Sequence, residues 1–244
     1  MGSSKAAGEG SERARVCVVA GVGPGNGLAI SRRFAREGYQ VAMLARRGEK
    51  LAQWQREIPG ARGFACDVTD ARAVAEAFAA IRRELGPVSV LIHNAALGAF
   101  GEFMETKPET LEATFRVNTL SLLLCGQEAA RDMLAAGSGA IVVTGNTSAR
   151  RGRAGFAGFA PTKAAQRILA ESMARSLGPR GVHVAYVVID AVIDVPWTRE
   201  RFAGKPDEFF AKPDDIAGTV WHLAHQPRSA WSFEVDLRPF GENW

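Results

Sequence analysis

The sequence is poor in cysteine and tyrosine, and it has no long hydrophobic run. Its 244 residues include three cysteines and two tyrosines. Cys17, Cys66 and Cys125 are odd in number, far apart and set in apolar stretches, with no CxxC pair and no Cys/His spacing. This pattern argues against a disulfide framework and against a zinc site. We therefore expect buried thiols and no metal ion.

No segment has the features of a membrane or export sequence. The longest apolar runs are much shorter than the about 20 residues that span a bilayer. The chain does not begin with the charged and apolar regions of a signal peptide. Charge is nearly balanced as well, because 30 basic residues are interspersed with 26 acidic ones. We therefore expect a cytoplasmic protein that binds neither membranes nor nucleic acid.

Short β-rich runs alternate with helical periods along most of the chain. Residues 1–13, rich in Gly, Ser, Ala and charge, predict a flexible tail, and residues 14–244 predict a single domain. The predicted strands cover residues 15–20, 40–45, 63–66, 88–93, 140–144, 182–189 and 232–237. The predicted helices cover residues 26–37, 49–57, 71–85, 109–135, 160–177 and 213–225. This alternation indicates an α/β fold, with helices on both faces of a mostly parallel seven-stranded sheet.

A glycine-rich turn follows the first predicted strand. Gly21, Gly25 and Gly27 lie between that strand and the helix that begins at Asn26. Glycines let the backbone turn tightly and approach a pyrophosphate, and the helix N-terminus offers free N–H groups and a positive dipole end. The placement therefore indicates a nucleotide phosphate site; a plain connection between strand and helix is the alternative.

The spacing Gly21-x3-Gly25-x-Gly27 resembles that of the short-chain dehydrogenase/reductase family. Four later landmarks of that family have similar residues here: Asp67 and Val68, Asn94 and Ala95 within His93 to Ala96, Asn118, and Lys163. The resemblance covers about residues 14–240. It implies a Rossmann-like, doubly wound fold and a nicotinamide cofactor. The implied cofactor-binding residues are Gly21, Gly25, Asn26, Gly27, Asp67, Val68, Asn94, Ala95, Lys163 and, after the sixth strand, Ile193.

The end of the second predicted strand bears on the choice of cofactor. Members of the family that prefer NAD usually place an Asp at the position of Ala45, and this chain has no carboxylate there. Arg46 and Arg47 follow, and a guanidinium is a planar donor suited to a phosphate. We therefore expect NADP rather than NAD; solvated loop charges are the alternative for the two arginines.

The catalytic positions of the family are altered in this chain. The Tyr-x-x-x-Lys motif reads Phe159 to Lys163, and neither tyrosine of the sequence can take the place of Phe159. The usual Ser position falls on Asn146, with Thr147 next to it. The usual Pro-Gly after the sixth strand is replaced by Asp190 and Ala191. In these respects the chain is similar to a divergent subgroup of the family that lacks the tyrosine.

The function implied by the resemblance is hydride transfer with NADP at a non-standard active site. Without a phenol as general acid, we expect reduction of an apolar carbonyl, an imine or an activated alkene. Water held by Asn118 and Lys163, or the carboxyl of Asp190, could supply the proton. The candidate catalytic residues are Asn118, Asn146, Thr147, Phe159, Lys163 and Asp190. The alternatives are an NADP-binding sensor or partner subunit without turnover, and an enzyme that uses the cofactor without net redox change.

Two further segments bear on substrate and partners. Residues 195–212, where the family has its substrate lid, contain Trp197 and three phenylalanines, which favour an apolar or bulky small-molecule substrate; packing of the lid on its own domain is the alternative. Arg150, Arg151 and Arg153 could face an anionic group or be solvated. The helix predicted over 109–135 is apolar on more than one face, which predicts a homodimer or homotetramer.

Overall fold

The computed structural model describes residues 15–242. Seven parallel strands form its central sheet, in the order β3-β2-β1-β4-β5-β6-β9. Their bounds are β1 Val16–Ala20, β2 Gln40–Ala45, β3 Ala61–Ala65, β4 Val88–His93, β5 Gly139–Asn146, β6 Val182–Ile189 and β9 Glu234–Leu237. The predicted Rossmann-like α/β fold is confirmed. The flexible tail predicted for residues 1–13 lies outside the described residues.

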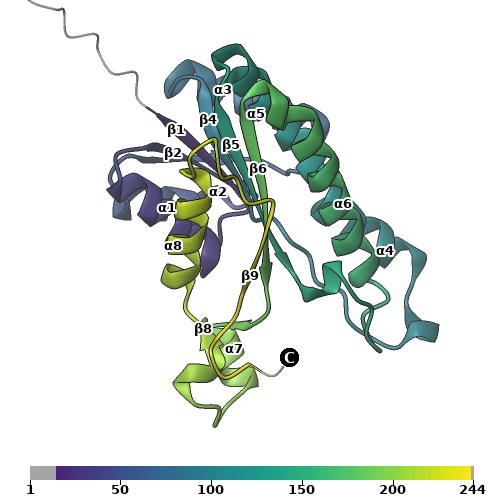
Figure 1. Cartoon of the computed structure of the whole chain (residues 1–244). Helices are drawn as coiled ribbons and strands as arrows, with labels where there is room; N and C mark the ends of the chain where they lie inside the picture. The colour runs from purple at the N-terminus through teal and green to yellow at the C-terminus, as the bar shows by residue number, and fades with distance from the viewer. Residues whose placement is uncertain (1–14, 243–244) are drawn as a thin grey trace, which may run out of the picture.

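Helices cover both faces of this sheet (Figure 1). The helices on one face are α1 Asn26–Arg36, α2 Gly48–Glu57 and α8 Pro213–Ala224. Those on the other are α3 Ala71–Glu84, α5 Ser121–Ala136 and α6 Ala160–Leu177. Helix α4 Pro108–Phe115 packs against the π-helical turn that follows it and against α6. Every residue of β1 and β6 is buried, because apolar cores lie on both sides of the central strands.

The strand order reverses at β1, and this reversal places a crevice at the carboxyl end of that strand. The chain winds outward from β1 through β2 to β3 and then returns to β4 on the other side of β1. The loops after β1 and β4 therefore leave the sheet toward opposite faces, and ligands of such sheets bind between them at the carboxyl ends of the strands. This edge contains the glycine-rich turn and the residues that follow β4.

Most predicted strands and helices shift by one or two residues at their ends, and the structure differs from the prediction more strongly in two places. The single helix predicted over residues 109–135 is two helices, α4 and α5, joined by a π-helical turn over Arg116–Leu120. The segment after β6 contains a short helix, α7 Pro196–Arg201, and a small parallel sheet of β7 Val192–Ile193 and β8 Phe210–Ala211. Elements of two to six residues are too short for periodicity to reveal. The 3-10 turns are Phe103–Glu105, Thr147–Ala149, Gly178–Arg180 and Asp207–Phe209.

Within residues 15–242, no helix combines the length and the apolar character that a membrane crossing requires. In the same part of the chain, no group of three or more His, Cys, Asp or Glu residues is arranged to hold a metal ion. The three cysteines are buried and free.

Candidate active site

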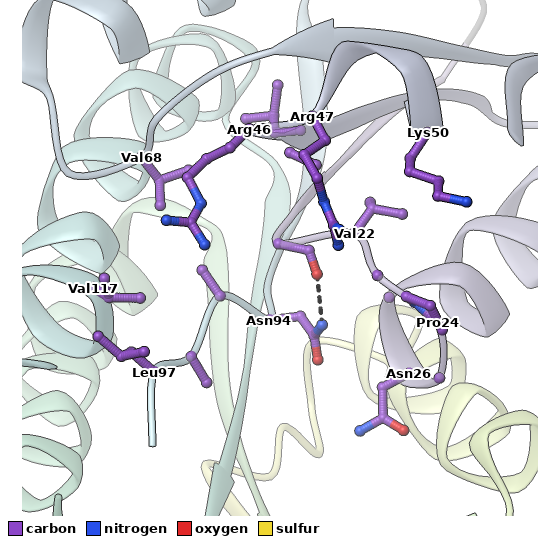
Figure 2. A pocket seen from close by; sticks show the side chains of 18 of the residues that line it. Val22, Pro24, Asn26, Arg46, Arg47, Lys50, Val68, Asn94, Leu97 and Val117 are labelled. Carbon is purple, nitrogen blue, oxygen red and sulfur yellow. Dashed lines mark hydrogen bonds between the residues drawn. The ribbon is translucent and has the colours of Figure 1, made fainter. Parts of the chain in front are cut away.

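A cavity of about 740 Å³ opens at the carboxyl ends of the strands, beside β1, β2 and β4. Its walls are the glycine-rich turn, the end of β2, the residues after β3 and β4, one side of the π-helical turn and the start of the segment after β6 (Figure 2). Every predicted cofactor-binding residue except Lys163 lines it: Gly21, Gly25, Asn26, Gly27, Arg46, Arg47, Asp67, Val68, Asn94, Ala95 and Ile193. These roles stay predictions, but the fold does bring the residues together.

The glycine-rich turn packs directly against the chain that leaves β4. Gly21 has a φ of +91°, and a Cβ there would lie 2.5 Å from Ala95 Cα. Gly27 is similarly close, because its Cβ would lie 2.7 Å from the Gly21 carbonyl oxygen. The Asn94 amide donates a hydrogen bond of 2.8 Å to that same oxygen (Figure 2). Only glycine fits at these positions, so the backbone itself forms this wall of the cavity.

Helix α1 begins at the turn, and its first two residues, Asn26 and Gly27, line the cavity. Its N-cap residue, Gly25, has a φ of +107° and no side chain to cap the helix. The side-chain oxygen of Asn26 is buried and has no hydrogen-bond partner among residues 15–242. An uncapped helix N-terminus beside glycine backbone suits the pyrophosphate of a dinucleotide. The residues present therefore fit the cofactor that the sequence implies.

Positive charge gathers at the end of the cavity formed by β2. Arg46, Arg47 and Lys50 line it and are exposed, and Figure 2 shows both arginine side chains pointing into it. Across from them, hydrogen bonds from the Thr69 N–H and hydroxyl lower the pKa of Asp67, helped by the charge of Arg46. This end of the cavity suits a second phosphate group. Lys50 was not singled out from the sequence, although it lies in the first turn of α2, four residues after Arg46.

None of the predicted catalytic residues lines the cavity. Asn146 and Asp190 lie at the ends of neighbouring strands, where Asn146 pairs in register with Ile189. The Asn146 side-chain oxygen accepts a hydrogen bond of 3.1 Å from Ser148 N–H, which caps the turn that Thr147 begins. The Asp190 side chain is partly exposed, and its backbone N–H donates to the Leu237 carbonyl. Asn146 therefore has a local structural role.

Phe159 lies immediately before α6 and is only 6% exposed. Its ring centroid is 5.2 Å from that of Phe100, which in turn lies 5.0 Å from Phe156. The chain around Phe100 is joined to the chain around Phe156 by a hydrogen bond from Gly101 N–H to the Gly155 carbonyl. Phe159 is therefore part of an aromatic cluster between two loops, and its ring packs against a neighbouring ring.

Asn118 is fully buried in the π-helical turn, and each polar atom of its side chain has a hydrogen-bond partner. The Leu97 N–H donates to its side-chain oxygen at 2.8 Å, and its amide nitrogen donates to the Leu97 carbonyl at 3.0 Å and to the Thr162 hydroxyl at 2.8 Å. Gln166 donates to its backbone carbonyl at 2.6 Å. Each Asn118 oxygen accepts one of these bonds and has a second lone pair, so a water molecule could bind there as a donor without displacing a partner.

Lys163 lies behind the cavity wall rather than in it, and is 2% exposed. Its ammonium donates to the Thr144 carbonyl at 3.3 Å and to the Gln166 side-chain oxygen. The Thr144 hydroxyl donates at 3.0 Å to Asn94, which lines the cavity. Burial lowers the pKa of Lys163 to about 7. One residue, Thr144, thus links the lysine to the cavity wall.

The environment of Lys163 contains polar residues that the sequence analysis did not assign to the site. His93 and Gln166 are fully buried beside it, and Tyr186 reaches Gln166 from β6. Burial, aided by the charge of Lys163, lowers the pKa of His93 to about 3. Gln166 follows Lys163 at a spacing of three on one helix, which places both on one face. That spacing was the available signal.

The lid segment divides between packing on itself and lining the cavity. Trp197 lines the cavity and is 63% exposed. The other three aromatics pack against one another, with ring centroids 5.6 Å apart for Phe202 and Phe209 and 5.1 Å apart for Phe209 and Phe210. Arg150 likewise pairs within the protein, with Glu234 at 2.6 Å and Asp236 at 2.7 Å. Of these candidates, only Trp197 faces the cavity.

The chain matches the family model described as short chain dehydrogenase over residues 15–205. Among curated proteins, the 3-oxoacyl-[acyl-carrier-protein] reductase MabA of Mycobacterium bovis is 34% identical over 223 residues, which is 88% of this chain and 87% of that protein.

Solved structures agree with this match. A short-chain dehydrogenase from Rhodopseudomonas palustris superposes with a TM-score of 0.79 at 34% identity, covering 93% of this chain and 99% of that one. A metagenomic short-chain oxidoreductase in complex with NADP superposes with a TM-score of 0.80 at 30% identity, covering 92% and 97%. The chain therefore belongs to the short chain dehydrogenase family and is an oxidoreductase of that type.

Proposed function

We propose that this chain is an NADP(H)-dependent reductase whose active site works without a catalytic tyrosine. The observation that supports the choice of cofactor is the set of exposed cations, Arg46, Arg47 and Lys50, at one end of the cavity, with alanine instead of a carboxylate at position 45. A 2′-phosphate would be attracted by these cations, and position 45 has no carboxylate that would repel it. The metagenomic relative whose structure contains NADP is consistent with this proposal.

The cofactor would be held along the length of the cavity. Gly21, Gly25 and the N-terminus of α1 would hold the pyrophosphate. Asp67 and Val68 would contact the adenosine half. Asn94, Ala95 and Ile193 would surround the nicotinamide half, and Lys163 would act on it from behind the wall, where Thr144 lies between the lysine and Asn94. When bound, NADPH supplies a hydride.

The substrate we propose is a small apolar carbonyl compound, imine or activated alkene. Leu97, Val117 and Trp197 line the cavity with apolar surface, and Phe159 replaces the residue that would donate a proton from a phenol. An imine that is already protonated, or an alkene activated by its own carbonyl group, needs less help from a general acid than a simple ketone does.

Two side chains of this chain are candidate proton donors. Lys163 has its pKa lowered to about 7, close to the working pH that favours general acid catalysis. Asp190 is partly exposed at the strand edge, next to the end of β5. We propose that Lys163 → Met and Asp190 → Asn identify the donor, since the variant that removes it should lower kcat by about 100-fold or more.

The test of the function is NADPH oxidation with a panel of ketones, imines and enones, repeated with NADH. We expect turnover with at least one class and a preference for NADPH. Tight NADPH binding without turnover of any compound would contradict the proposal and would favour a cofactor-binding sensor or partner subunit. Interconversion of a substrate without net NADPH consumption would instead identify chemistry that uses the cofactor internally.

We also propose a homodimer or homotetramer, in a cytoplasmic protein that folds as one domain over residues 14–244. Support for self-association comes from large apolar side chains left exposed on α4, α6 and the loop before α4: Phe103, Met104, Leu111, Phe115 and Ile168. Exposed apolar surface of this extent is typical of interfaces. Light scattering at micromolar concentration should give at least the dimer mass, and a monomer would contradict the proposal.

A further inference from the structure

The side chain of Gln166 uses both ends of its amide inside the protein. Its oxygen accepts hydrogen bonds from the Lys163 ammonium and, at 3.3 Å, from the Tyr186 hydroxyl. Its nitrogen donates to the Asn118 carbonyl at 2.6 Å and lies 3.4 Å from His93 Nδ1. Gln166 therefore joins α6 to β4, β6 and the π-helical turn while remaining fully buried.

The orientation of this amide is determined by the residues around it. The Ser121 hydroxyl donates to the Val117 carbonyl at 2.5 Å, so its lone pairs are free to accept from His93 Nε2 at 2.7 Å. His93 Nδ1 is then an acceptor, which suits the amide nitrogen of Gln166 and not its oxygen. A neutral His93 agrees with a pKa near 3. The Gln166 oxygen must therefore face Lys163.

The π-helical turn and the start of α6 are joined by further hydrogen bonds. The Asn118 amide donates to the Thr162 hydroxyl, and the Thr119 hydroxyl donates to the Thr162 carbonyl, both at 2.8 Å. Together with the bond from Gln166 to the Asn118 carbonyl, they fix the first turn of α6, which contains Lys163. The lysine is thus held at its backbone as well as at its ammonium.

No carboxylate contacts the Lys163 ammonium within the described chain. The ammonium donates to two neutral oxygens, the carbonyl of Thr144 and the side-chain amide of Gln166. Titratable or charged groups do pack around it on other elements: His93 on β4, Tyr186 on β6, and beyond Tyr186 the ion pairs of Glu234 with Arg150 and Arg167. Glu234 is already engaged by two arginines, so its charge is largely compensated.

We infer that Gln166 is the positioning residue of the active-site lysine, and that its amide oxygen holds the Lys163 ammonium in a neutral shell beside the cavity wall. The inference rests on the proposed function, in which Lys163 acts on the bound cofactor and substrate. A neutral acceptor orients the lysine as a carboxylate would, but leaves the cost of burying its charge uncompensated. Gln166 thereby sets the pH range over which Lys163 is protonated.

This arrangement has a defined consequence for pH dependence. The protonated lysine carries the positive charge that attracts an anionic cofactor. It also carries the proton that could be donated to the substrate. Both are lost as the pH rises through the pKa of Lys163, which is about 7. Replacing the neutral amide by a carboxylate should stabilise the ammonium and move this loss to higher pH.

The test compares the variants Gln166 → Glu and Gln166 → Met with the parent chain. The Lys163 titration is followed by NMR on the full chain without cofactor, labelled with ¹³C at lysine Cε, and assigned by the signal that disappears in Lys163 → Met. We expect Gln166 → Glu to raise the titration midpoint by about one unit or more, and Gln166 → Met to lower it. The pH dependence of kcat/KM, where turnover is found, should shift in the same direction.

Matched variants separate positioning from general disruption. Gln127 → Glu makes the same chemical change at an exposed position of α5 and should leave the midpoint unchanged. Tyr186 → Phe removes the weaker donor to the Gln166 oxygen and should shift the midpoint by about half a unit or less. An unchanged Lys163 midpoint in folded Gln166 → Glu would overturn the inference. The NMR titration needs no turnover, so absence of activity with every substrate would count against the proposed function alone.

Discussion

The cavity lies next to a buried polar cluster made of Lys163, Gln166, His93 and Tyr186. The two regions differ in solvent exposure and in charge. The cavity is open, and its cations Arg46, Arg47 and Lys50 are exposed. Lys163 is buried among neutral oxygens, with only Thr144 between it and the cavity wall residue Asn94. Exposed charges are weakened by salt, whereas a buried one is screened much less and responds to pH through its own desolvation. Salt should therefore affect cofactor binding through the cavity, and pH through the buried lysine.

The largest effect is expected at the glycine-rich turn. Gly21 → Ala adds a Cβ that would lie 2.5 Å from Ala95 Cα at a φ of +91°, so the wall of the cavity must move. We expect NADPH affinity to fall by about 100-fold or more, measured by the change in NADPH fluorescence. Gly23 → Ala is the matched control, because nothing lies within 4 Å of its added Cβ. Equal losses in the two variants would contradict this account of the turn.

The next largest effect is expected for the cations of the cavity. Arg46 → Ala removes a donor that we assign to the 2′-phosphate, so NADPH affinity should fall by about tenfold while NADH affinity stays nearly constant. The loss should shrink at high salt. Arg56 → Ala, an exposed arginine on α2 outside the cavity, should change neither affinity. If Arg46 → Ala weakened both cofactors equally, the arginine would not select between them.

The buried lysine should make folding stability depend on pH. Folding lowers the pKa of Lys163 from its ordinary 10.5 to about 7, so between these values the unfolded chain binds more protons than the folded one. This contribution therefore makes the unfolding free energy rise with pH from about 7 to about 10. In Lys163 → Met the rise should be smaller, by up to about 1.4 kcal/mol per pH unit, measured by urea unfolding at several pH values. Lys107 is exposed, so Lys107 → Met should show the same dependence of unfolding free energy on pH as the parent chain. The same dependence in Lys163 → Met would contradict a lowered pKa for the buried lysine.

A smaller effect is expected at Phe159. Phe159 → Tyr adds one oxygen to a ring that packs against Phe100, so it should cost about 1 kcal/mol of stability. If this ring borders the substrate, the new phenol should raise reduction of simple ketones, because Lys163 lies in the first turn of the helix that Phe159 precedes. Phe156 → Tyr, in the same aromatic cluster, is the control. Unchanged ketone reduction would place Phe159 outside the reaction.

The sequence predicted the sheet and the lining of the cavity better than the polar contacts of Lys163 and Gln166. Strands that are apolar throughout and glycines at strand ends are local signals, so β1, β6 and the turn at Gly21 could be located from sequence. The π-helical turn over Arg116–Leu120 was missed. One inserted residue rotates the faces that follow it by about 100°, and the resulting apolar surface on more than one face of residues 109–135 was interpreted only as a sign of self-association. The pairing of Gln166 with His93 and Tyr186 joins residues 73 and 20 positions apart, and no local pattern encodes such contacts.

The most direct test of the central claim, that this cavity is an NADP(H) site selected by its cations, is the ratio of NADH to NADPH dissociation constants for the unmodified chain. Both constants can be measured by fluorescence titration at low and at moderate salt. We predict NADPH to bind about tenfold tighter or more at low salt, with the ratio falling as salt is added. Equal affinities, or tighter binding of NADH, would contradict the account.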